Sequence, residues 1–193
     1  MNRRTFVGAT TATVGAALAG CSTPGGERTL GSPQVETKAD GEEVDLSFER
    51  GSEDVLTVTI RQRALTLAPS GRYGLKLTLS HSENTRLKRF RFDFKSPPGT
   101  LGVPADIFLK QPDGGPWPAI DFGRVEGQWT RVGVEGLGDL GEGRLGFEVI
   151  VAPLDEGGEP VAIRQDVTLA TTGLLSGGSL RAEHRTEFTP VLG

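Results

Sequence analysis

The sequence has very little sulfur and imidazole: one cysteine, one methionine and two histidines among 193 residues. A single cysteine, Cys21, excludes a disulfide within the chain, so any fold must be held by its apolar core alone. Long hydrophobic runs are also missing. The weakly apolar stretch 7–19 would span only about 20 Å as a helix, which is short of the ~30 Å hydrocarbon core of a bilayer.

Positive charge is in deficit. Lysine and arginine total 21 against 25 acidic residues, and lysine is scarce, with five copies beside sixteen arginines. No basic stripe runs along the chain, which excludes nucleic acid as the expected partner. At this length the chain is large enough for one domain with its own core.

Catalytic motifs are missing as well. The chain has no Gly-x-Ser-x-Gly elbow, and its acidic residues fall in turns or on the outer faces of expected strands. His81 and His184, with Glu83 and Glu183, do not have the spacing of a known metal motif. The acidic loops at 113–115 and 155–159 lack regular Asp-x-Asp spacing, and turn chemistry explains them. We therefore expect no enzyme, no metal and no cofactor.

The first twenty residues contain a recognisable address. Arg3, Arg4 and Phe6 match the pattern of a twin-arginine export signal, whereas Asn2, Val7 and Gly8 depart from it. The segment resembles that signal class, which is read by a receptor and is not itself an anchor. The apolar stretch that follows has the length of a signal-peptide hydrophobic region.

Leu18-Ala19-Gly20-Cys21 resembles a lipobox at all four positions. The resemblance implies lipidation of Cys21, a lipid membrane as partner, and a location on the extracytoplasmic face of the cell membrane. With this thiol taken and Met1 as the only methionine, a blue-copper site is excluded. The lipobox, the twin arginines and the preference for arginine together resemble uncharacterised surface lipoproteins of halophilic archaea.

Three regions follow from these features. Residues 1–20 are expected to be a signal peptide. Residues 21–43, rich in proline, glycine and charge, are expected to be a flexible tether. Residues 44–193 are expected to form a β-sandwich domain.

Apolar residues in that domain recur with period two, which predicts half-buried strands. Phe90, Phe92 and Phe94 are the clearest case, with charged residues between them. A change of parity at Leu65 and Leu67 predicts a bulge or a break near 62–64. The expected strands cover 44–48, 56–60, 73–79, 90–94, 105–110, 119–123, 128–134, 145–151, 161–171 and 180–190.

Many short strands separated by turns predict an all-β fold, namely an antiparallel immunoglobulin-like β-sandwich with extra strands. Leu137, Leu140 and Gly143 before the strand at Leu145 loosely resemble a corner of that fold, although its Cys–Trp–Cys core is absent. The alternative is an eight-stranded closed barrel.

Trp117 lies between two prolines, on a loop that they stiffen. Such an indole suits contact with a surface protein or glycan, with Arg124 or Arg131 as polar neighbours. The other interpretation is that Trp117 folds back and caps the sandwich. Trp129 is expected in the core.

These features predict a membrane-anchored extracytoplasmic lipoprotein with a non-catalytic binding or interaction domain. A lipocalin-like carrier of small ligands and a cell-surface hydrolase are the alternatives.

Overall fold

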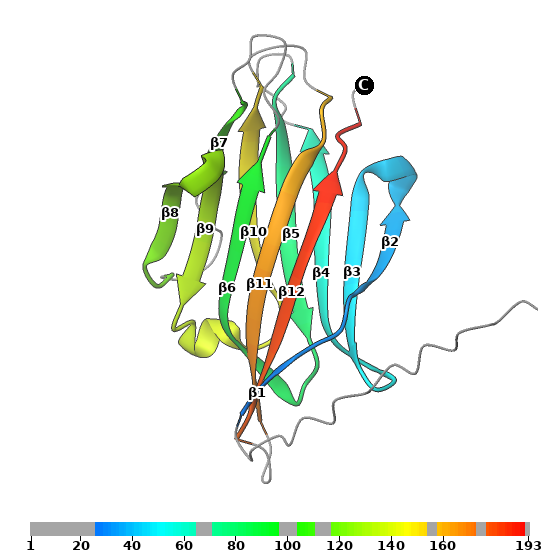
Figure 1. Cartoon of the computed structure of the whole chain (residues 1–193), viewed down its shortest axis with the longest axis vertical. Helices are drawn as coiled ribbons and strands as arrows, with labels where there is room; N and C mark the ends of the chain where they lie inside the picture. Colours follow the sequence, from blue (N-terminus) through cyan, green and yellow to red (C-terminus); the bar gives the residue numbers. More distant parts are fainter. Residues whose placement is uncertain are drawn as a thin grey trace, which may run out of the picture.

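The computed structural model describes residues 26–64, 71–96, 104–110, 117–153, 158–172 and 177–191. This part of the chain forms twelve strands in two six-stranded sheets that face each other (Figure 1). We call them the β6 sheet and the β4 sheet. Neighbouring strands pair antiparallel except β1 and β12, which are parallel.

The β6 sheet has the order β1 (Glu27–Thr29), β12 (Ser179–Phe188), β11 (Val161–Thr171), β6 (Thr85–Lys95), β9 (Trp129–Glu135) and β8 (Ile120–Val125). The β4 sheet has the order β2 (Gln34–Lys38), β3 (Glu43–Arg50), β4 (Glu53–Ala64), β5 (Tyr73–His81), β10 (Leu145–Ala152) and β7 (Asp106–Lys110). Three short 3₁₀ turns complete the described elements: η1 (Ala39–Gly41), η2 (Glu126–Gln128) and η3 (Gly138–Gly141).

The core lies between the two sheets and follows from the alternation in the sequence. Phe90, Phe92 and Phe94 are at most 2% exposed. The ring of Phe147, on β10 of the other sheet, stacks on Phe90 with 5.2 Å between centroids and contacts Phe92 at 5.5 Å. Each fully buried phenylalanine contributes about 2–3 kcal/mol of hydrophobic stabilisation. The aromatic cluster therefore joins the two layers.

The antiparallel sandwich is confirmed, and the closed barrel is wrong. Each sheet ends in two edge strands, β1 and β8 in one and β2 and β7 in the other. A barrel would require the edge strands to pair with each other. Of the two irregularities expected near 62–64, the bulge is wrong, because β4 pairs with β5 residue for residue from Leu56 to Ala64, where the strand ends. Leu65 and Leu67 lie outside the described residues.

The predicted tether is wrong from Glu27 onward. β1 pairs with β12, β2 pairs with β3, and Leu30 is 8% exposed in the core. Both strands are short and fully exposed, so they lack the alternating pattern by which longer strands are predicted. The signal residues Arg3, Arg4 and Phe6, and the lipobox Cys21, lie outside the described residues. The described part contains no helix long and apolar enough to cross a membrane.

The two ends of the sandwich are distinct. β1 begins at the end where β5 turns into β6 and where β12 starts, at the bottom of Figure 1. We call this the β1 end. The chain finishes at the opposite end, where the Gln62 amide accepts a hydrogen bond from the Val191 N–H at 2.8 Å and donates one to its carbonyl at 2.7 Å.

Candidate binding face

The outer face of the β6 sheet is covered with charge. The alternation that turns the phenylalanines of β6 inward turns Arg89, Arg91, Asp93 and Lys95 outward. The register then brings charges from other strands beside them. Arg91 lies opposite Asp166 of β11, and Asp93 lies opposite both Arg164 of β11 and Arg131 of β9.

Two aspartates on this face accept bidentate hydrogen bonds from arginines. Arg131 donates Nε–H to Asp93 Oδ1 at 2.8 Å and Nη2–H to Oδ2 at 3.2 Å. Arg181 donates to both oxygens of Asp166 at 3.0 and 2.9 Å, and Arg89 lies 3.6 Å from the same carboxylate. Burial alone would raise the pKa of Asp166, but the hydrogen bond from Arg181 and the nearby arginine charges hold it below its usual value.

Other cations on the face are less closely paired. Among the described residues, neither Arg91 nor Arg164 has a carboxylate oxygen within 4.0 Å, although the charge of Arg91 helps to lower the pKa of Asp166. The acid paired with Arg185 is Glu187, 3.9 Å away on the same strand. Arg164 and Arg185 lie directly opposite each other in register, although like charges in that position repel. The guanidinium groups of Arg91 and Arg164 therefore make no close ion pair on this face.

Trp129 is buried as expected, at 6% exposed, but it does not belong to the apolar cluster between the two sheets. Thr130, Val132 and Val134 follow the inward alternation of β9, so Trp129 points outward. Its ring is covered by cations: the guanidinium carbon of Arg164 lies 4.0 Å from the ring centroid, and the charged ends of Lys95 and Arg185 lie at 5.9 Å. The parity of the strand was the signal that could have placed this residue correctly.

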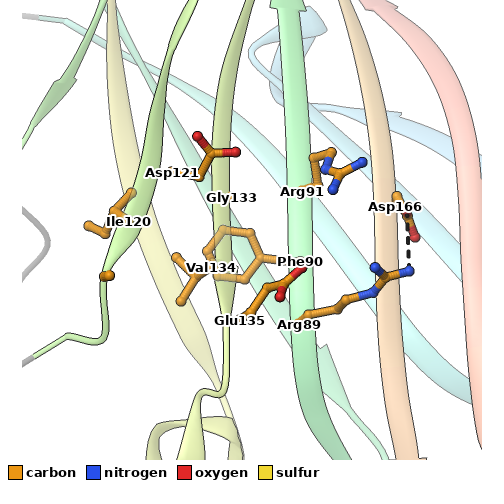
Figure 2. Close-up of a pocket in the computed structure, with 10 residues that line it drawn as sticks. Arg89, Phe90, Arg91, Ile120, Asp121, Gly133, Val134, Glu135 and Asp166 are labelled. Carbon is orange, nitrogen blue, oxygen red and sulfur yellow. Dashed lines mark ion pairs between the residues drawn. The ribbon is translucent and has the colours of Figure 1, made fainter.

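Two hollows open on this face. The first encloses about 330 Å³ and is lined by Arg89, Arg91, Asp121, Gly133 and Glu135, among others. Figure 2 shows Arg91 and Asp121 on either side of Gly133, which contributes no side chain. A Cβ at Gly133 would fit without a clash, in van der Waals contact with Asp121 and the Phe90 carbonyl at 3.7 Å.

The second hollow encloses about 410 Å³ and adjoins the first. Its cationic lining comprises Arg91, Arg164, Arg181 and Arg185, and its acids include Asp93, Asp166 and Glu183. Arg91 and Asp166 line both hollows. Because Arg131 and Arg181 already engage the two aspartates, the second hollow presents the guanidinium groups of Arg91 and Arg164, neither of which has a carboxylate oxygen within 4.0 Å among the described residues.

The structure does not bring the predicted binding residues together. Trp117 is half-buried and packs on the core, with its ring edge-on to Phe90 at 6.5 Å, in line with the capping alternative. Arg124 pairs with Asp106 at 2.9 Å, joining β8 to β7 across the edge of the sandwich. Of the three, Arg131 alone belongs to the charged face. Sequence reasoning missed Arg91, Arg164 and Arg185, whose proximity depends on strand register.

His81 lies apart from the two hollows, whereas His184 is among the residues that line the second. Both ring nitrogens of His81 have partners: Nδ1 contacts Ser82 O and Thr85 Oγ1 at 3.1 Å, and Nε2 contacts Gly141 O at 3.0 Å. His184 is half-buried, and burial lowers its pKa. In the described part of the chain, no group of three or more His, Cys, Asp or Glu side chains could hold a metal ion. The acidic loop at 113–115 and most of that at 155–159 lie outside the described residues.

One buried polar side chain is exceptional. Gln165 points inward from β11 and is 4% exposed. Neither its amide nitrogen nor its amide oxygen has a hydrogen-bond partner among the described residues.

Comparison with known proteins assigns a family. Residues 27–192 match the model of a domain of unknown function, DUF8121. The chain belongs to this family. No curated protein matches it. The family match begins at the first residue of β1, so the DUF8121 domain includes the two short strands that the sequence analysis assigned to a tether.

Several solved structures are distantly similar to this DUF8121 chain, each at 14% identity. A DUF4466 family protein from Parabacteroides merdae aligns with a TM-score of 0.36 over 68% of this chain and 43% of its own, less than half its length. BslA, described as a bacterial hydrophobin, aligns at 0.38 over 74% and 100%. The RrgA Jo.In complex aligns at 0.36 over 82% and 94%.

Proposed function

We propose that the protein is a membrane-anchored extracytoplasmic lipoprotein whose β-sandwich is a non-catalytic binding module. The binding function is supported by the outer face of the β6 sheet. There Arg91 and Arg164 border a hollow, and neither arginine has a carboxylate oxygen within 4.0 Å among the described residues. Unpaired arginines at the centre of an ordered face are preorganised donors for a ligand.

The anchoring part rests on the sequence of the first 21 residues. The twin arginines with Phe6 supply the export signal, and Cys21 of the lipobox takes the lipid. Four residues lie between Cys21 and Gly26, where the described domain begins, so the two are five residue steps apart. An extended chain of that length reaches about 18 Å at most. The β1 end of the sandwich is then held close to the lipid surface.

This geometry turns the opposite end outward. Lys95 ends β6, Arg164 lies near the start of β11, and Arg185 lies near the end of β12. All three therefore lie toward the end of the sandwich away from β1 (Figure 1). A lipocalin-like carrier would instead need an interior cavity, but the phenylalanine cluster fills the space between the sheets.

Cell fractionation tests the anchor. The wild-type chain should sediment with membranes, whereas Cys21→Ser should be released or remain unprocessed. Arg3→Lys with Arg4→Lys should leave folded precursor in the cytoplasm. Unchanged membrane partition of Cys21→Ser would refute anchoring by lipid.

The Cys21→Ser chain also tests binding without the anchor. Incubated with washed cell envelopes, it should sediment with them, and Arg91→Gln with Arg164→Gln in the same chain should reduce that fraction. Equal sedimentation of both chains would refute the outer face of the β6 sheet as the binding surface.

A further inference from the structure

We propose that the hollow bordered by Arg91, Arg164 and Arg185 binds the acidic groups, carboxylate or sulfate, of an extracellular polysaccharide. This inference rests on the proposed binding function and adds the chemical class of the ligand. It starts from the pairing of charges on the outer face of the β6 sheet.

The charge pairing leaves the hollow positive. Asp93 is held by Arg131, and Asp166 by Arg181. Glu183 lies 2.6 Å from Arg181 as well. Arg91 and Arg164 have no carboxylate oxygen within 4.0 Å among the described residues, although Arg91 lies opposite Asp166, and Arg185 has only the exposed Glu187 at 3.9 Å. An anionic group entering the hollow would therefore find donors that no protein carboxylate occupies.

The positions of Arg164 and Arg185 also favour the binding of an anion. They are direct cross-strand neighbours in the β11–β12 pair, where like charges destabilise a sheet. The Trp129 ring, 4.0 Å from the Arg164 guanidinium carbon, holds that group in place by a cation–π contact. An anion between the two arginines would relieve their repulsion, and the fork of donors on each matches a carboxylate or sulfate.

The form of the face favours a polysaccharide over a protein. A stable protein interface buries about 800 Å² on each partner around an apolar or aromatic centre. Here the centre is charged, and Trp129 is covered at 6% exposed. The two adjoining hollows of about 330 and 410 Å³ are each close to the lower size of a small-molecule site. A chain of sugars could place successive units in them.

Gly133 helps to form the first hollow. It leaves a gap between Arg91 of β6 and Asp121 of β8 (Figure 2). Glycine weakens a strand interior and often marks a site that a ligand approaches closely. A cation and a carboxylate on either side of such a gap supply both donors and acceptors for the hydroxyl groups of a sugar.

Binding of defined polymers to the purified full chain in neutral detergent tests the inference. The probes are polygalacturonate for carboxylates, dextran sulfate for sulfates, and dextran as the uncharged control. We expect binding to at least one acidic polymer and none to dextran. Arg91→Gln and Arg164→Gln should each weaken that affinity about tenfold or more, the loss expected for a charge-assisted hydrogen bond.

Arg63→Gln is the matched control, because it removes one exposed arginine from β4 on the other sheet. It should change the affinity less than about twofold. Gly133→Gln, which fills the first hollow without altering charge, should also weaken binding. Thermal melting of each variant checks folding, and Lys95→Gln provides a further variant if Arg164→Gln melts early.

Three results would overturn the inference. The first is that dextran binds as tightly as the acidic polymers. The second is that Arg63→Gln and Arg164→Gln lose the same affinity for the acidic polymer. The third is that neither acidic polymer binds. In the last case the Cys21→Ser chain distinguishes the two proposals. If it still sediments with envelopes, the ligand class is wrong and the binding function stands.

Discussion

Two consecutive residues of β6 have opposite environments. Phe92 is fully buried between the sheets, and Arg91 is half-buried on the outer face. Phe92→Ala should lower the free energy of unfolding by about 3–5 kcal/mol, because it removes a large side chain and leaves a cavity. Arg91→Ala should lower it by less than about 0.5 kcal/mol. Denaturant melts measure both, and equal losses would mean that the register of β6 is wrong.

At Gln165, in contrast, a substitution is expected to stabilise the fold. A buried amide without a partner costs about 1–3 kcal/mol, and methionine has nearly the same shape without the polar atoms. Gln165→Met should therefore raise the free energy of unfolding by about 1 kcal/mol or more in urea melts. Gln62→Met, which removes the two bonds to Val191, should lower it. A loss of stability in Gln165→Met would reveal a bound partner for the amide, such as a buried water.

At the scale of elements, β1 and the residue that follows it decide where the domain begins. Leu30 is 8% exposed, and its N–H donates to Arg181 O at 2.8 Å. Leu30→Ala should lower the free energy of unfolding by about 2–5 kcal/mol. Val35→Ala, at a side chain 55% exposed on β2, is the control and should cost under about 0.5 kcal/mol. No effect of Leu30→Ala in denaturant melts would restore the flexible tether.

The pairing of β11 with β12 predicts a dependence on pH. The Asp166 carboxylate, held by Arg181, has a pKa below its usual value in the folded chain. The stabilisation from this pair is therefore complete above the unfolded pKa of about 3.9 and is lost as the pH falls through the lower folded pKa. Asp166→Asn should be less stable than wild type at pH 7, and the difference should shrink below pH ~3.9.

Urea midpoints at several pH values measure this difference. Glu187→Gln is the control, because Glu187 is 61% exposed and 3.9 Å from Arg185, and pairs of that kind contribute little. If the difference in urea midpoint between wild type and Asp166→Asn stays constant down to pH 2, the carboxylate does not stabilise the fold through its charge.

The elements that could be predicted from the sequence are those with a strong local pattern. Phe90, Phe92 and Phe94 fix the faces of β6 because they alternate with charges over five residues. β1 has only three residues, and its partner Ser179–Arg181 lies about 150 positions further along the chain, so no local pattern reveals it. Trp129 was misplaced because an aromatic residue suggested burial in the core, although the parity of β9 turns it outward.

At the scale of the whole molecule, the candidate face results from strand order. Arg91, Arg164 and Arg185 come from β6, β11 and β12, which are neighbours in one sheet. The sequence shows that each residue alternates with buried ones, but the order and register of the strands exist only in the fold. The proposed lipidation signal differs from this face, because the resemblance to a lipobox lies in four consecutive residues and is visible in the sequence alone.

The strand order and the N-terminal motif together suggest how the molecule is oriented. In the proposed arrangement, the short connection of four residues between Cys21 and Gly26 keeps the β1 end near the membrane, and the arginine-lined hollow lies toward the other end. The anchored module would then bind its ligand through the outer face of the β6 sheet.

Photo-cross-linking on intact cells tests that claim most directly. A benzophenone amino acid is placed at position 187, on the outer face of the β6 sheet beside the hollow, or at position 63, on the outer face of the β4 sheet. Illumination should give a covalent adduct from position 187 and none from position 63, and Arg164→Gln should abolish it. Adducts of equal yield from both positions, or from position 63 alone, would contradict the account.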